Sequence, residues 1–235
     1  DPAFAFELGH IVKDGLRRMY GENSENVYYY LTVYNEPYVH PAEPENLDVE
    51  GLLKGIYLYS PASKKHKKNA QILASGVGVN WALKAQQLLA DDWGVKASVW
   101  SVTSWNELRR DGLETDRHNL MNPKDKRTAY VTKKLKGARG PVIAVSDYMR
   151  AVQDQISPWV EQPFYSLGTD GFGLSDTRGA LRRHFNVDAE SIALAVLQQL
   201  CNEGDIRQVT VTKSMEKYRI HDVSAADAGN TEGSC

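Results

Sequence analysis

The sequence predicts an α/β protein in which a mainly parallel open sheet carries helices on both faces. Short apolar stretches rich in β-branched and aromatic residues alternate with longer amphipathic stretches along most of the chain. This alternation is typical of strand–helix–strand units and therefore of parallel sheets. Residues 51–60 and 70–75 are two predicted strands joined by a lysine-rich segment at residues 61–68. We expect them to form a hairpin with a solvated tip, which adds one antiparallel edge strand.

The composition is that of a globular protein. The 235 residues are 42% hydrophobic and 25% charged, enough to bury a substantial core. With 28 Lys and Arg against 30 Asp and Glu, the net charge of −2 favours neither nucleic acid nor anionic membranes as partners. No apolar run approaches the roughly 20 residues that cross a bilayer, and no signal-peptide pattern is present. We expect a cytoplasmic protein in which Cys201 and Cys235 are reduced thiols.

The first 40 residues predict one helix and one strand. Apolar side chains recur at helical spacing in residues 3–19, between Pro2 and Gly21, which predicts a helix that covers a sheet. Residues 26–34 form an almost continuous β-branched and aromatic run, typical of a strand buried on both faces. A helix followed by a strand is half of a strand–helix–strand unit, and the chain starts at Asp1 without a methionine. We expect a piece of a longer protein.

A short polar loop follows the strand predicted at residues 26–34. At this position the carboxyl edge of an α/β sheet opens into its binding crevice. The loop contains Asn35, Glu36, Tyr38 and His40. We predict that Glu36 and His40 are catalytic, because a carboxylate and an imidazole in one loop can set one another's protonation state. Two ordinary loop residues are the alternative.

The middle of the chain predicts a linker and then the rest of the sheet. Residues 41–50 are proline-rich and acidic, which predicts an exposed linker between two domains. Gly76 and Gly78 follow a strand, but no third glycine and no GK[ST] motif accompany them, so we assign them to close packing. The other predicted strands are residues 96–102, 141–145 and 164–167. The other predicted helices are residues 80–92, a short helix that follows a capping sequence at residues 103–107 and ends near Gly112, and residues 130–135, 149–156 and 189–202. Ser146 and Asp147 are the predicted cap of the helix at residues 149–156, and Asp188 is the predicted cap of the helix at residues 189–202.

A glycine-rich loop joins the last predicted strand to an amphipathic helix. Gly168, Gly171 and Gly173 can take the positive φ values that other residues avoid, and Ser175 or Asp176 can cap the helix. Such loops hold ligands or subunit contacts in open α/β sheets, but the spacing alone favours a corner packed for structure. We therefore predict a structural loop, with an aspartate bound to backbone amides, formed by Gly168, Asp170, Gly171, Gly173 and Asp176.

Four blocks of the sequence resemble one enzyme family. They are YSLGTDGFGLSDTRGALRRHFNV at residues 165–187, ENVYYYLTVYNEPYVHPAEP at residues 25–44, VWSVTSWNELRRDG at residues 99–112, and SDYM at residues 146–149. Together they are similar to the carboxyl-terminal part of homodimeric bacterial pyruvate dehydrogenases of the actinobacterial kind. These are the thiamine-diphosphate-dependent, decarboxylating components of the pyruvate dehydrogenase complex. The resemblance spans residues 1 to about 200 and weakens after Glu203.

The resemblance implies a domain division. Residues 51–209 are expected to form a transketolase-type carboxyl-terminal domain behind the linker at residues 41–50. Residues 1–40 are expected to be the last helix and strand of the domain that binds the pyrimidine ring of thiamine diphosphate. Residues 210–235 are expected to be a mobile tail, because small and polar residues leave little to bury there.

The resemblance also implies an activity. It implies oxidative decarboxylation of pyruvate with thiamine diphosphate and Mg²⁺, and reductive acetylation of the lipoyl group of dihydrolipoyl acetyltransferase. The enzyme would be a cytoplasmic homodimer, part of a multienzyme complex that acts on the product of glycolysis. The main cofactor-binding residues of the family precede residue 1, so we expect this chain alone to be inactive. The alternative is a non-catalytic module that dimerises or docks the acetyltransferase core.

The family assigns roles to the loop that contains Glu36 and His40. A glutamate and a histidine there line the channel to the thiazolium carbon and help to orient substrate and intermediates. The resemblance carries these roles to Glu36 and His40. Because the family loop varies by one residue around the histidine, Val39 is the alternative occupant of the imidazole position.

Overall fold

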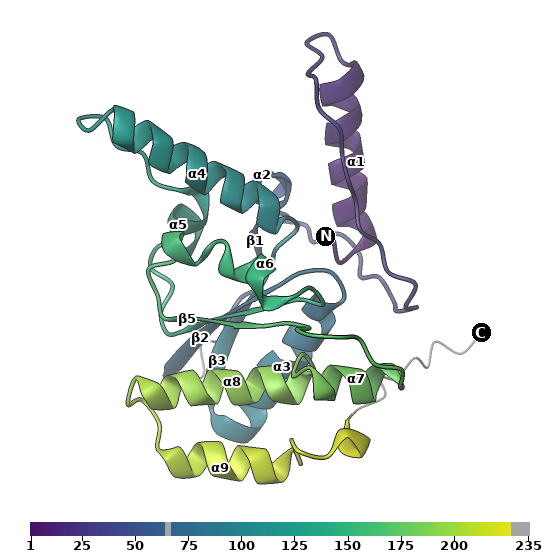
Figure 1. The fold of residues 1–235 in the computed structure, drawn as a ribbon, viewed down its shortest axis with the longest axis vertical. Coiled ribbons are helices and arrows are strands. Elements are labelled where there is room, and N and C mark those ends of the chain that lie inside the picture. The colour runs from purple at the N-terminus through teal and green to yellow at the C-terminus, as the bar shows by residue number, and fades with distance from the viewer. Residues whose placement is uncertain (64–66, 227–235) are drawn as a thin grey trace.

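A five-stranded mixed sheet lies at the centre of the computed structural model, which describes residues 1–63 and 67–226 (Figure 1). The strand order is β1-β3-β2-β4-β5. Strands β2 to β5 pair in parallel with their neighbours, whereas β1 pairs antiparallel with β3 at one edge. The predicted α/β class with one antiparallel edge strand is confirmed. The strands are β1 (Tyr57–Ser60), β2 (Lys68–Ala74), β3 (Val95–Ser101), β4 (Val142–Val145) and β5 (Phe164–Leu167).

Helices cover both faces of this sheet (Figure 1). Ile72 and Ile143 pack on one side with side chains of α3, α8 and α9, while Leu73 and Ala144 pack on the other with α4 and α5. Successive strand residues therefore enter opposite cores, which explains why these strands are apolar without alternation. The helices are α3 (Gly78–Trp93), α4 (Trp105–Met121), α5 (Tyr130–Leu135), α6 (Arg150–Asp154), α7 (Arg178–His184), α8 (Ala189–Asn202) and α9 (Gln208–Lys217).

The predicted hairpin is wrong, although its edge strand exists. In the sheet order β3 lies between β1 and β2, and Leu58 of β1 is opposite Trp100 of β3. The first part of the predicted strand is instead a short helix, α2 (Val49–Leu53), whose cap Asp48 accepts a hydrogen bond of 2.9 Å from the Gly51 amide. A short apolar run does not by itself distinguish helix from strand. Residues 64–66 of the predicted hairpin tip lie outside the described residues.

Helix α4 continues past the end predicted at Gly112. A Cβ atom at this glycine would lie 2.4 Å from the indole ring of Trp159, so the glycine provides room for a tryptophan from another part of the chain. The helix ends at Met121, more than two turns beyond the predicted end. Gly112 is a packing residue here rather than a helix end.

The domain also continues past residue 209, where the sequence predicts its end. Helix α9 packs through Val211 on the core cluster of α3 and α8, and Tyr218 and Ile220 are buried in the same cluster. The chain then makes one 3-10 turn at Val223–Ala225. The expected mobile tail from residue 210 is therefore contradicted as far as Ile220, where the chain is still packed on the core. Residues 227–235 lie outside the described part of the chain.

The amino-terminal segment stands at the side of the sheet (Figure 1). Its helix α1 (Ala5–Tyr20) packs on α2 and β1 through Ile11, rather than covering the sheet as predicted. The strand predicted at residues 26–34 is also wrong. These residues are irregular, with the Tyr28 and Tyr30 side chains 86% and 84% exposed. The physical reason is that a strand needs a hydrogen-bonded neighbour, and no described residue pairs with this stretch.

Candidate functional site

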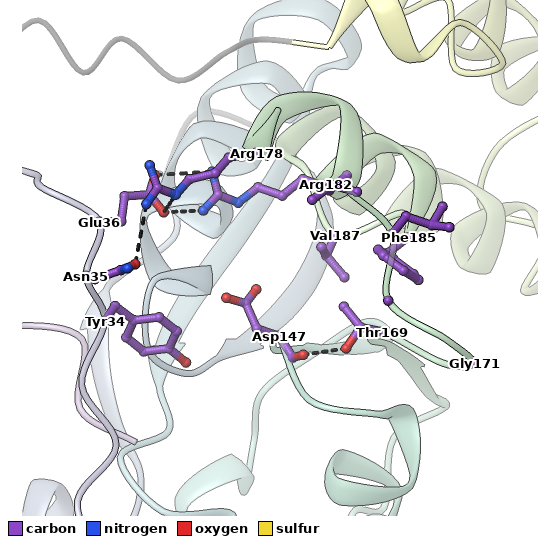
Figure 2. A pocket seen from close by; sticks show the side chains of 13 residues that line it. Tyr34, Asn35, Glu36, Asp147, Thr169, Gly171, Arg178, Arg182, Phe185 and Val187 are labelled. Carbon is purple, nitrogen blue, oxygen red and sulfur yellow. Dashed lines mark hydrogen bonds and ion pairs between the residues drawn. The ribbon is translucent and has the colours of Figure 1, made fainter. Parts of the chain in front are cut away.

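A cavity of about 410 Å³ lies at the carboxyl edge of the parallel strands (Figure 2). The irregular segment after α1 forms one wall, and α7 and the glycine-rich loop form the other. This is the edge at which open α/β sheets bind ligands. The lining residues are Tyr34, Asn35, Glu36, Asp147, Thr169, Gly171, Gly173, Leu174, Arg178, Leu181, Arg182, Phe185 and Val187.

Glu36 is held in this cavity by two arginines of α7. Arg182 donates from both terminal nitrogens, with Nη1 at 3.2 Å from Glu36 Oε1 and Nη2 bound to Oε2. Both side chains are mostly buried, with exposed fractions of 9% for Arg182 and 11% for Glu36. Arg178 approaches the same carboxylate at 4.0 Å. A bidentate guanidinium–carboxylate pair fixes position as well as charge, so the predicted residue Glu36 has one defined orientation.

Arg182 packs on the side chain of Trp81. Its guanidinium lies over the Trp81 ring, 4.7 Å from the centroid. A planar guanidinium on the face of an indole combines a cation–π attraction with close packing. Neither Arg182 nor Trp81 was predicted as a site residue, because their contact with Glu36 joins three segments that lie far apart in the sequence.

Asp147 brings a second carboxylate to the cavity. It follows β4 by two residues, and Figure 2 shows its side chain directed into the space between Tyr34 and Val187. Burial raises the pKa of the Asp147 carboxyl; the positive charge of Arg182 lowers that pKa, and the negative charge of Glu36 raises it further. Asp147 was predicted, with Ser146, to cap the next helix, but α6 has no side-chain cap from either residue. Its position directly after a buried strand, which also singled out Glu36, is the signal that could have identified it.

His40 lies outside this cavity. Its Nδ1 accepts a hydrogen bond of 3.1 Å from the Ala5 amide, and its ring packs on Tyr38 at 4.6 Å between centroids. A separate cavity of about 240 Å³ is lined by His40 and Tyr38, and Glu36 lines it as well. No hydrogen bond joins Glu36 to His40 within the described residues, so the direct contact expected between them is absent. Val39, the alternative occupant, is an exposed side chain that lines neither cavity.

The glycines of the loop have different roles. Gly171 has φ of +85°, in the region that favours glycine. Gly168 lacks a positive φ, but a Cβ atom there would lie 2.4 Å from the Tyr148 carbonyl oxygen. At Gly173 φ is not positive and a Cβ atom would meet nothing within 4 Å. The expectation of positive φ is therefore wrong for Gly168 and Gly173.

The aspartates of the loop bind backbone amides. Asp170 Oδ1 accepts a hydrogen bond of 3.0 Å from the Arg150 amide at the start of α6, and Asp176 Oδ1 accepts one of 2.7 Å from the Thr177 amide. The cap of α7 is Thr177, whose hydroxyl accepts from the Ala180 amide at 3.3 Å. The predicted caps Ser175 and Asp176 are one or two residues too early. The structural role of Asp170 is to cap α6 from across the loop.

The described residues contain neither a cluster suited to a metal ion nor a helix suited to a membrane. Within residues 1–63 and 67–226, no three His, Cys, Asp or Glu side chains converge in a way that could hold a metal ion. In the same part of the chain, every helix is too short or too polar to cross a membrane. Glu36 and Asp147 therefore offer hydrogen-bonding and proton-exchanging chemistry rather than a complete set of metal ligands.

Comparison with known proteins gives consistent matches along the chain. Residues 55–188 match the model of the transketolase-like C-terminal domain, and residues 1–41 match that of the pyruvate dehydrogenase E1 component middle domain. The pyruvate dehydrogenase E1 component of Mycolicibacterium smegmatis is 60% identical over 227 residues, covering 96% of this chain and 24% of that protein. The E1 component of Mycobacterium tuberculosis is 55% identical over 233 residues, with coverages of 99% and 25%.

More distant solved structures resemble the chain weakly. A transketolase from Pichia stipitis is 20% identical with a TM-score of 0.47, covering 71% of this chain and 21% of that one. The chain spans about a quarter of the length of the curated relatives it matches. The domain match covers more than half of the residues, and its fold agrees with the observed mixed sheet. This chain belongs to the family of transketolase-like C-terminal domains, and it is similar along almost its whole length to pyruvate dehydrogenase E1 components.

Proposed function

We propose that this chain forms one wall of the active site of a pyruvate dehydrogenase E1 component. The observation that carries the proposal is the placement of Glu36. The sequence singles out this residue by its loop, and in the structure Arg182 holds it in the cavity of about 410 Å³ at the ligand-binding edge of the sheet. The 60% identity to a named E1 component supports the same assignment.

The proposed reaction is oxidative decarboxylation of pyruvate, followed by reductive acetylation of the lipoyl group of dihydrolipoyl acetyltransferase. Thiamine diphosphate, when bound, supplies the electron sink for this chemistry. Glu36 acts as an oriented hydrogen-bond acceptor on the substrate side, since Arg182 leaves its carboxylate little freedom. His40 remains a proposed orienting residue, placed at the second cavity that it shares with Glu36.

The diphosphate and Mg²⁺ would be bound mainly by residues outside this chain. The resemblance supports this, because the GDG motif with its downstream asparagine, which anchors them in the family, does not occur in the sequence. We accordingly propose the domain division that the resemblance implies: residues 1–40 from the pyrimidine-binding domain, residues 41–50 as a linker, and the transketolase-type domain from residue 51 onward.

The assembly is proposed to be a cytoplasmic homodimer that joins dihydrolipoyl acetyltransferase in the complex. Exposed aromatic residues of the amino-terminal segment, Tyr28 and Tyr30, support burial against another surface. The same observation favours the second candidate function, a non-catalytic module that acts by dimerisation or docking. The two candidates differ in what they predict for a substitution inside the cavity.

The experiment compares the isolated chain with a complete E1 polypeptide that carries it. Calorimetric titration of the isolated chain with thiamine diphosphate and Mg²⁺ should show no tight binding. The complete protein should bind both, and it should reduce a dye when pyruvate is supplied as the substrate. Glu36→Gln in the complete protein should lower kcat about 10- to 10³-fold, with the exposed Glu22→Gln as the matched control. Unchanged kcat in Glu36→Gln would favour the docking module, and turnover by the isolated chain would place the active site elsewhere.

A further inference from the structure

Asp147 is a titratable residue of the cavity to which the proposed function has given no role. Its side chain enters the cavity from the end of β4, on the opposite side from the segment that carries Glu36 (Figure 2). Its backbone is held in place, because the Thr169 hydroxyl donates to the Asp147 carbonyl oxygen. The Asp147 carboxylate therefore points into the cavity from the end of β4.

No described residue donates a hydrogen bond to the Asp147 carboxylate, and none forms an ion pair with it. The two fully buried carboxylates among the described residues, Glu7 and Asp188, both have hydrogen-bond partners. Glu7 accepts from two amides and two hydroxyls, and Asp188 binds Arg183 and the Ser191 amide. A carboxylate has about four acceptor positions, and leaving them unfilled away from water is costly. Asp147 therefore has acceptor positions left for a ligand.

Burial is the main cause of the raised pKa of Asp147. Of the charged and titratable groups around it, Glu36 on the amino-terminal segment raises the pKa further, Arg182 on α7 lowers it, and the Tyr34 phenol lines the same cavity. Burial also raises the pKa of the Tyr34 phenol, so this group remains a neutral donor, and its hydroxyl binds Asp1 Oδ1 at 2.9 Å. A group that costs stability and lines a cavity is typical of a functional residue.

We propose, on the basis of the proposed function, that Asp147 is a further catalytic residue that exchanges a proton with an oxygen atom of a small 2-oxo acid in the cavity. In the forward step a nucleophile adds to the carbonyl carbon and the π electron pair of the C=O bond moves onto the substrate oxygen, while the O–H bond of the Asp147 carboxyl breaks and a new O–H bond forms on that oxygen. The Asp147 carboxylate is left behind. In the reverse sense the carboxylate takes the proton back when the carbonyl re-forms, so protons and charge balance over the cycle.

The first test measures proton binding without any activity. The side-chain carboxyl carbons of aspartates are titrated by ¹³C NMR in the 235-residue chain, with the Asp147 signal assigned by its loss in Asp147→Asn. The midpoint should lie above the ordinary value of about 4, and Glu36→Gln should lower it by removing a facing negative charge. A midpoint at or below the ordinary value would overturn the proposal.

The second test uses the complete E1 polypeptide. Asp147→Asn should lower kcat about 10- to 10²-fold with little change in KM, and should remove the part of the pH profile in which the rate falls as Asp147 ionises. Asp147→Glu, which keeps the carboxyl group, should restore part of the rate. The control is Asp91→Asn, at an exposed position of α3.

The outcomes separate this inference from the function on which it rests. A wild-type complete protein without pyruvate-dependent dye reduction would overturn the proposed function. An active wild type whose Asp147→Asn variant keeps both kcat and the pH profile would overturn the role of Asp147 alone. Equal losses in Asp147→Asn and Asp147→Glu, with an unaltered pH profile, would also overturn it, because they would indicate a steric role.

Discussion

The Ser101 hydroxyl, at the end of β3, donates a hydrogen bond of 2.6 Å to the carboxylate of Glu7 in α1, 94 residues away in the sequence. The Tyr57 hydroxyl donates to the same oxygen, and the amides of Ala3 and Phe4 donate to the other. Glu7 is completely buried. This one carboxylate therefore joins the amino-terminal helix to two strands of the sheet, and so helps to place the segment that carries Glu36.

Replacing Glu7 should reveal this connection. In Glu7→Gln an NH₂ group, which only donates, replaces one of the two carboxylate oxygens. The groups that donated to that oxygen are two hydroxyls or two backbone amides, so at least one buried donor loses its acceptor. We expect a loss of about 1–3 kcal/mol in the free energy of unfolding, measured by urea denaturation. Glu22→Gln, at an exposed position after α1, should leave stability unchanged. If both variants unfold like the wild type, the buried hydrogen bonds of Glu7 contribute nothing net.

The two glycines Gly171 and Gly173 should respond differently to alanine. Gly171→Ala places a Cβ atom on a residue with φ of +85°, which should cost about 1–2 kcal/mol in the free energy of unfolding. Gly173→Ala should change it little, because φ is not positive and the added carbon meets open space. Thermal unfolding of the two variants side by side tests this. A larger loss in Gly173→Ala would contradict the backbone geometry described for the loop.

Arg183 should be among the residues most sensitive to substitution. It is 2% exposed, pairs with Asp188, and donates to the carbonyl oxygens of Tyr218 and Arg219 at 3.0 and 3.2 Å. Arg183→Met would leave the carboxylate of Asp188 buried without its partner, a change that costs about 3–5 kcal/mol. Denaturant unfolding should show this loss.

The matched control for Arg183→Met is Arg110→Met. Arg110 forms an exposed ion pair of 2.9 Å with Glu107, a kind of contact that contributes little to stability. We expect near wild-type unfolding for this variant. Equal losses in the two variants would show that the burial of Arg183 does not set its contribution.

The raised pKa of Asp147 predicts a pH dependence of stability with a definite sign. The folded state favours the protonated carboxyl, so the stabilisation is complete below the unfolded value of about 4 and is lost as the pH rises through the higher folded value. Asn does not ionise, so Asp147→Asn should gain stability relative to the wild type as the pH rises. Melting temperatures at pH 4 and pH 7.5 measure the difference. A difference that is equal at both pH values would contradict the burial of this charge.

Local patterns were sufficient for much of the sheet and its covering helices. Periodicity predicted α5 and α8 with their observed bounds, and Asp188 caps α8 as expected by accepting from the Ser191 amide at 3.1 Å. The apolar run at β5 was likewise predicted with its observed bounds. Such elements are determined by side chains within a few residues of one another, so a single stretch of sequence contains the whole signal.

The position of Glu36 after an apolar run was also readable from the sequence, whereas its chemical surroundings were not. The run itself is no strand in the structure, so the correct residue was selected with a wrong element. Arg182 lies 146 residues from Glu36, and nothing in either local pattern pairs them. The role of Asp147 was likewise not readable from the sequence. The residue lies in a helix-cap pattern, which gave no indication that its side chain faces a cavity.

Local sequence patterns were enough to identify the stretches that have the period of a helix or a strand, and the polar residues that follow them. The pairing of the strands, the end of α4 and the set of side chains that meet in the cavity depend on tertiary contacts. Strand β1 pairs with β3 rather than β2, and α4 passes Gly112 because Trp159 packs there. Periodicity depends on neighbours along the chain, whereas pairing and packing depend on the combined burial of residues far apart in sequence, which no single segment encodes.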